Sequence, residues 1–74
     1  MYGYKMEIIK LRDEYIKLGQ ALKAAGLVES GVEAKNVINE GLVFVNDKVE
    51  YQRGKKLRDG DIVTFNDNQI KINV

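Results

Sequence analysis

The chain has 74 residues, of which 45% are hydrophobic and 31% are charged, and its formal net charge is +1. A chain of this size forms one small domain with a single core, and its composition is that of a globular protein rather than a disordered one. It contains no cysteine and no histidine, which excludes disulfide bonds, thiolate nucleophiles, imidazole bases and most zinc sites. We therefore expect one domain over residues 1–74, without a cofactor, in the reducing environment of the cytoplasm.

The first fifteen residues predict a strand rather than a targeting or membrane segment. Charged residues interrupt their apolar residues, so they resemble neither the core of a signal peptide nor a membrane span. The apolar and β-branched residues from Met6 to Leu11 favour an edge strand. We interpret Tyr2 and Tyr4, which precede it, as packing or tail residues rather than as platforms for stacked bases.

Two short helices are predicted next. The segment from Ile16 to Ala25 places leucine and alanine at the spacing of one helical face, and Gly26 supplies a left-handed end. A second helix begins after Ser30, because serine followed three residues later by Glu33 forms a capping box, and Gly41 ends it. The link between the helices is so short that they must pack against each other.

The remaining apolar segments predict the strands of a sheet. Leu42 to Val45 and Lys48 to Glu50 flank Asn46-Asp47, which indicates a tight hairpin. Ile62 to Phe65 and Gln69 to Val74 predict two more strands, joined by an asparagine-rich turn. The expected fold is α+β, with two short helices packed on a small, curved antiparallel sheet.

The segment from Arg53 to Arg58, hereafter the cationic loop, concentrates positive charge in a nearly neutral chain. Four of its six residues are cationic, Gly54 allows a partner to approach the backbone, and Leu57 predicts that the loop is anchored to the core. Lysine and arginine neutralise phosphates and release condensed counterions. The start of the second helix adds backbone donors that suit a phosphate oxygen. These features favour a nucleic-acid surface over a merely solvated loop.

The sequence offers no catalytic constellation. Its acidic residues are spread among caps, turns and strand ends, so no paired acid and base can be assembled and the spacing of a calcium loop is missing. No glycine-rich phosphate-binding loop occurs, because the glycines lie singly at the boundaries of predicted elements. We therefore do not expect an enzyme.

The order of motifs adds a family resemblance. The pattern S-G-V-E-A-K-x-x-I-x-E-G-x-V-x-V-N, followed by V-E-x-x-R-G-K-K-L-R-x-G-D-x-V, resembles the RNA-binding domain named after ribosomal small-subunit protein S4, in particular its small stand-alone bacterial members. The match covers about residues 16–63. It implies an αL fold, in which two helices and the following sheet present a basic surface to structured RNA, usually ribosomal or transfer RNA. We expect a monomer that binds such RNA, free or in a ribosomal particle.

Carried over by position, the resemblance implies an RNA-binding surface of ten residues. These are Ser30, Lys35, Asn46, Arg53, Lys55, Lys56 and Arg58, with Lys17, Gln20 and Lys23 at the margin. Two positions depart from the family pattern. Gly31 stands where many members have arginine, which removes a phosphate or base contact, and Asp47 replaces the usual glycine after the turn asparagine, which weakens the hairpin.

A protein-interaction module is the alternative. Its cationic loop would meet an acidic partner, and its edge strand would add to the partner's sheet. The near-zero net charge favours this hypothesis, because dedicated nucleic-acid binders are often more basic overall.

Overall fold

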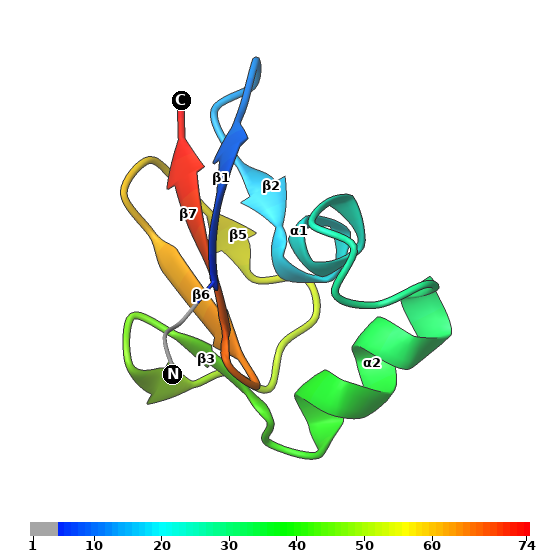
Figure 1. Cartoon of the computed structure of the whole chain (residues 1–74). Helices are drawn as coiled ribbons and strands as arrows, with labels where there is room; N and C mark the ends of the chain where they lie inside the picture. Colours follow the sequence, from blue (N-terminus) through cyan, green and yellow to red (C-terminus); the bar gives the residue numbers. More distant parts are fainter. Residues whose placement is uncertain (1–4) are drawn as a thin grey trace.

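The computed structural model describes residues 5–74, which form two layers, a pair of helices on a sheet (Figure 1). The elements in chain order are β1 (Lys5–Lys10), β2 (Ile16–Lys17), α1 (Leu18–Ala24), α2 (Gly31–Asn39), β3 (Val43–Val45), β4 (Lys48–Val49), β5 (Lys56–Leu57), β6 (Ile62–Phe65) and β7 (Asn68–Asn73). Five strands form one sheet in the order β1-β7-β6-β3-β4, and β2 and β5 form a second, two-stranded sheet. Tyr2 and Tyr4 lie outside the described residues. Within residues 5–74, neither helix has the length and hydropathy needed to cross a bilayer.

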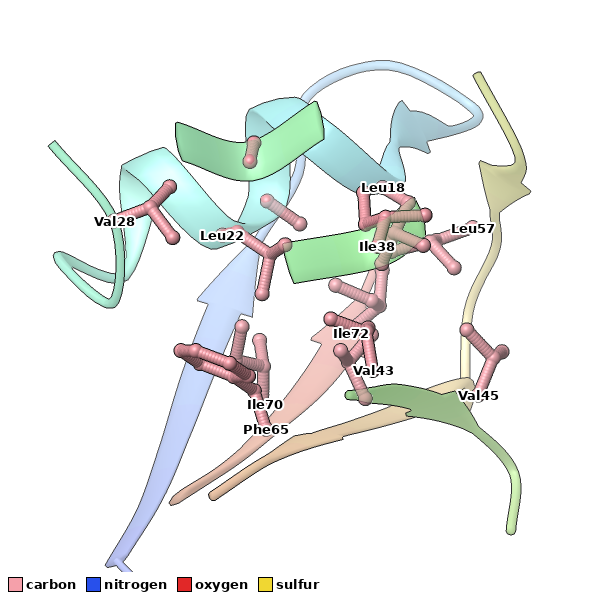
Figure 2. Close-up of a cluster of buried hydrophobic side chains, with 13 residues drawn as sticks. Leu18, Leu22, Val28, Ile38, Val43, Val45, Leu57, Phe65, Ile70 and Ile72 are labelled. Carbon is pink, nitrogen blue, oxygen red and sulfur yellow. The ribbon is translucent and has the colours of Figure 1, made fainter. Parts of the chain in front are cut away.

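The core lies between the helices and the larger sheet (Figure 2). Alternate residues of β3, β6 and β7 point toward the helices, as expected for a sheet with one covered face. The buried side chains are Leu18, Ala21, Leu22, Val28, Ala34, Ile38, Val43, Val45, Leu57, Val63, Phe65, Ile70 and Ile72. Leu57 comes from the cationic loop, so the same core that holds the helices also holds that loop.

Both helices end at the predicted glycines, and the second helix begins at the predicted cap. Ser30 Oγ accepts a hydrogen bond from the Glu33 N–H at 3.1 Å. The Glu33 carboxylate reaches back to the Glu29 N–H at 2.8 Å, one residue earlier than in the usual capping box. Gly26 and Gly41 follow the two helices with φ angles of 74° and 76°, a conformation that side chains other than glycine's rarely adopt. The predicted second helix is confirmed.

The predicted hairpin is also confirmed. Asn46 and Asp47 have φ angles of 51° and 69°, as a two-residue turn between twisted strands requires. The Asn46 side chain then ties this turn to the start of β6. Its Oδ1 accepts from the Ile62 N–H at 2.9 Å, and its Nδ2 donates to Asp61 Oδ1 at 3.0 Å.

One strand pair of the sheet differs from the prediction. β1 is an edge strand, as expected, but it runs parallel to β7, with Ile9 opposite Ile72. The sheet is therefore mixed rather than antiparallel. The reason is topological, because β1 and β7 are the first and last described strands, and the whole domain serves as the crossover that a parallel pair needs. The α+β class and the packing of two helices on the sheet are as predicted.

The beginning of the first helix also differs. Ile16 and Lys17 were expected to be helical, but they form β2 and pair with Lys56 and Leu57 of the cationic loop. The helix α1 begins only at Leu18. This pairing joins segments about forty residues apart, so no local pattern could predict it.

Candidate functional site

The cationic loop is attached to the start of α1 by its main chain. The Leu18 N–H donates to the Lys55 carbonyl at 2.8 Å, and the Gly19 N–H donates to the Arg53 carbonyl at 3.1 Å. Both N–H groups belong to the first turn of the helix, where no intrahelical acceptor exists. Leu57, which has no exposed surface, fixes the end of the loop in the core. The predicted anchor at Leu57 is confirmed, and the α1 start is a second anchor.

The pairing of β2 with β5 places two lysines opposite each other. Ile16 pairs with Leu57 and packs on the core, so the neighbouring pair, Lys17 and Lys56, points the other way and is exposed. Figure 1 shows β2 of this small sheet directly beside α1. Directly opposed side chains in an antiparallel pair lie about 4.5–5.5 Å apart at Cβ, and like charges there destabilise the pair.

Tyr15 completes this exposed face. The antiparallel register, continued by one residue, places Tyr15 opposite Arg58. The Arg58 guanidinium carbon lies 5.6 Å from the centre of the Tyr15 ring, and the Lys56 ammonium lies 4.8 Å from it, both within cation–π range. Tyr15, Lys17, Lys56 and Arg58 together are hereafter the β2–β5 face.

A shallow hollow of about 340 Å³ lies between the two helices and the cationic loop. Three cations, three glycines and one glutamine line it, namely Lys17, Lys23, Arg53, Gly19, Gly31, Gly54 and Gln20. We call it the α1–α2 hollow. Nothing lies within 4 Å of the point where a Cβ at Gly31 would be, so the missing arginine at this position leaves open space at the start of α2.

Gly19 leaves the space in which the Arg53 side chain packs. A Cβ at Gly19 would lie 2.7 Å from Arg53 Cγ and 3.3 Å from Arg53 Cδ, closer than carbon atoms approach without a shift. Glycine near the start of a helix lowers helix stability. Here it allows the aliphatic part of Arg53 to cross the first turn of α1.

The sequence matches the S4 domain family over residues 9–73, which is most of the chain. The protein belongs to the S4 domain family. Over 55 residues, 74% of this chain and 78% of the relative, it is 46% identical to a Bacillus subtilis (strain 168) protein named probable ribosome maturation protein RlbA. The solution structure of YbcJ from E. coli, whose αL motif is described as involved in RNA binding, matches with a TM-score of 0.69 and 28% identity, covering 100% of this chain and 92% of that one. The predicted family and αL fold are confirmed.

In this S4 domain, six of the ten predicted site residues fall into two groups. Lys17, Gln20, Lys23 and Arg53 line the α1–α2 hollow, and Lys17 also belongs to the β2–β5 face with Lys56 and Arg58. Lys55 instead borders a separate hollow beside the hairpin, together with Asn46 and Asp61.

The last two predicted residues are Ser30, which caps α2, and Lys35, which lies on it. The Ser30 hydroxyl is engaged in capping, and Lys35 is exposed on the helix but lines neither of these hollows. Of the four cations of the loop, Arg53 therefore lines the α1–α2 hollow, Lys56 and Arg58 lie on the β2–β5 face, and Lys55 lies beside the hairpin.

Tyr15 and Gly19 lie against predicted site residues but were not themselves predicted to belong to the candidate site. The signal for Tyr15 was present but weak, because the alternation of Tyr15, Ile16 and Lys17 is typical of a strand with one exposed face. No sequence signal identifies Gly19, since the Arg53 stem that needs the space comes from a distant loop.

Proposed function

We propose that this S4 domain binds structured RNA, without catalysing a reaction, through the α1–α2 hollow and the β2–β5 face acting as one surface. Lys17 belongs to both and lies opposite Lys56. The observation that best supports this proposal is the like-charge pair, because it weakens the small sheet that contains it. A polyanion bound across the pair relieves the repulsion, so the arrangement is favourable in the complex.

The two parts of the surface are contiguous. Gln20 and Lys23 border the α1–α2 hollow and also a second hollow that reaches Tyr15. Anchored cations suit the regular phosphates of a folded RNA, which proteins recognise mainly through shape, backbone and 2′-hydroxyl contacts. Lys55 and Asn46 extend the proposed surface toward the hairpin, and Ser30 and Lys35 extend it along α2.

Ribosomal RNA is the ligand that we propose, with transfer RNA as the comparison. The B. subtilis relative carries the name of a ribosome maturation protein, and the αL motif of YbcJ is described as involved in RNA binding. The proposed site of action is therefore ribosomal RNA, free or within a ribosomal particle, in the cytoplasm.

The test is a titration of the protein with ribosomal RNA, and in parallel with transfer RNA, at several salt concentrations. The α1–α2 hollow and the β2–β5 face, which form the centre of the proposed surface, contain five cations, Lys17, Lys23, Arg53, Lys56 and Arg58. With each contacting one phosphate, the plot of log affinity against log salt has a slope of roughly −3.5 to −4.5, at about 0.7–0.9 per contact. Affinity that does not change with salt would contradict the proposal.

A pull-down with and without ribonuclease identifies the partner class, since partners that persist after digestion indicate a protein-interaction module instead.

Replacing Lys17 with glutamate (K17E) should change RNA affinity and stability in opposite directions. RNA affinity is expected to fall at least about tenfold, because one charged phosphate contact is lost and a repulsion is added. The free energy of unfolding is expected to rise by a few tenths to about 1 kcal/mol, since the new carboxylate pairs with Lys56 and precedes the positive end of the α1 dipole. Filter binding and thermal unfolding measure the two effects.

The matched control for K17E is K71E, which makes the same charge change. Lys71 is exposed on β7 between the buried residues Ile70 and Ile72, so it points to the sheet face away from the helices. The RNA affinity of K71E should stay within about twofold of the wild-type affinity, because only the net charge changes. Equal losses in K17E and K71E would mean that net charge, rather than this surface, determines binding.

Replacing Gly19 with alanine (G19A) is expected to weaken RNA binding without weakening the fold. Alanine raises helix propensity by up to about 1 kcal/mol, but its methyl group displaces the Arg53 stem, which lies within 2.7 Å of its position. We expect RNA affinity about three- to tenfold lower because Arg53 loses its fixed position. In the R53A background, G19A should have no further effect on RNA affinity. A further loss of affinity there would show that Gly19 does not act by positioning Arg53.

A further inference from the structure

We propose that Tyr15 is a positioning residue that holds Lys56 and Arg58 ready for two RNA phosphates, an inference that rests on the proposed function. Tyr15 immediately precedes β2, and its neighbours across the strand pair are the two cations. Their charged groups lie 4.8 Å and 5.6 Å from the centre of its ring. No other aromatic residue of the described chain has a cation placed over it in this way.

The surroundings of Tyr15 favour this role over a purely structural one. Its side chain is 36% exposed and lies outside the buried core. The next residue, Ile16, supplies the apolar contact with the core, and main-chain pairing with β5 sets the strand position. The fold therefore does not depend on an aromatic ring at position 15, whereas the two cations do contact that ring.

The benefit of the ring is preorganisation. Lysine and arginine side chains have many rotamers, and binding a phosphate requires each to adopt a few of them. An aromatic face attracts both charges through its quadrupole and leaves their remaining hydrogen-bond donors free. Because Lys56 also faces Lys17, the ring keeps the lysine ammonium over its own face despite the repulsion from the strand neighbour.

Two substitutions separate the ring from the hydroxyl. Tyr15→Phe keeps the aromatic face, so its affinity for ribosomal RNA should stay within about twofold of wild type. Tyr15→Leu keeps an apolar side chain but removes the face, and we expect affinity to fall about three- to tenfold. The slope of log affinity against log salt should stay unchanged in Tyr15→Leu, because Lys56 and Arg58 still reach the phosphates.

A double-mutant background tests whether Tyr15 acts through the two cations. In K56A/R58A, Tyr15→Leu should change affinity less than about twofold. An independent readout is the NMR shift of the Lys56 and Arg58 side-chain protons, which the nearby ring moves upfield in wild type and in Tyr15→Phe but not in Tyr15→Leu.

The outcomes are distinct. If wild type binds RNA but Tyr15→Leu binds equally well, this inference is wrong and the proposed function stands. A further loss from Tyr15→Leu in the K56A/R58A background also overturns it, since Tyr15 would then contact the RNA itself. Wild-type protein that fails to bind ribosomal or transfer RNA at low salt overturns the proposed function, and this inference with it.

Discussion

Replacing Lys56 and Arg58 together with glutamate (K56E/R58E) is expected to lower the affinity for ribosomal RNA by about a hundredfold at low salt, from the loss of two charged contacts at roughly tenfold or more each. Lys56 of β5 and Arg58, which directly follows that strand, both lie over the Tyr15 ring. The salt slope should decrease by roughly 1.4–1.8, which corresponds to two phosphate contacts. Filter binding over a range of salt concentrations measures affinity and slope together.

The control is K10E/K71E, which changes the net charge by the same amount at exposed residues of β1 and β7. The fold should be intact in both double variants, because Lys56 and Arg58 are exposed and Leu57 between them is unchanged. A loss in K10E/K71E as large as in K56E/R58E would contradict a localised RNA surface on β2 and β5.

Replacing Leu57 with alanine (L57A) is expected to lower stability far more than any of the surface substitutions above. Leu57 has no exposed surface, and truncating a buried leucine costs about 2–5 kcal/mol. A domain of this size has a free energy of unfolding of roughly 4–11 kcal/mol, so the melting temperature should fall by about 10 °C or more. Calorimetry or circular dichroism measures the shift.

Leu57 also fixes the cationic loop, so L57A should weaken RNA binding even where the protein is folded. The matched control is L22A, because Leu22 is equally buried but comes from α1. Both variants should lose similar stability, and at a temperature where both are folded only L57A should lose RNA affinity, by about three- to tenfold. If L22A lost as much affinity as L57A, the anchored loop would have no special importance.

Local chemistry made the helices and the hairpin predictable. Ser30 and Glu33 form a cap within four residues, and Asn46-Asp47 forms a turn between adjacent strands. Such signals act over a few residues and depend little on the rest of the fold. For the same reason, the family pattern could be recognised from the spacing of caps, turns and basic residues.

The parts that sequence reasoning missed all depend on contacts between distant segments. The parallel pairing of β1 with β7 and the pairing of Ile16–Lys17 with Lys56–Leu57 each join residues separated by most of the domain. Lys17 was predicted at the margin of the site, but its position opposite Lys56 could not be predicted. Gly19 and Tyr15 gain their roles only because the cationic loop folds back onto them.

The most direct test of the proposed surface is an NMR titration of ¹⁵N-labelled protein with a ribosomal RNA fragment that it binds. The largest amide and side-chain shifts should occur at residues 15–23, near Gly31 and at residues 53–58, which form the α1–α2 hollow and the β2–β5 face. Shifts concentrated instead at Phe44, Thr64 and Gln69, which border a hollow on the larger sheet, would contradict the proposed surface.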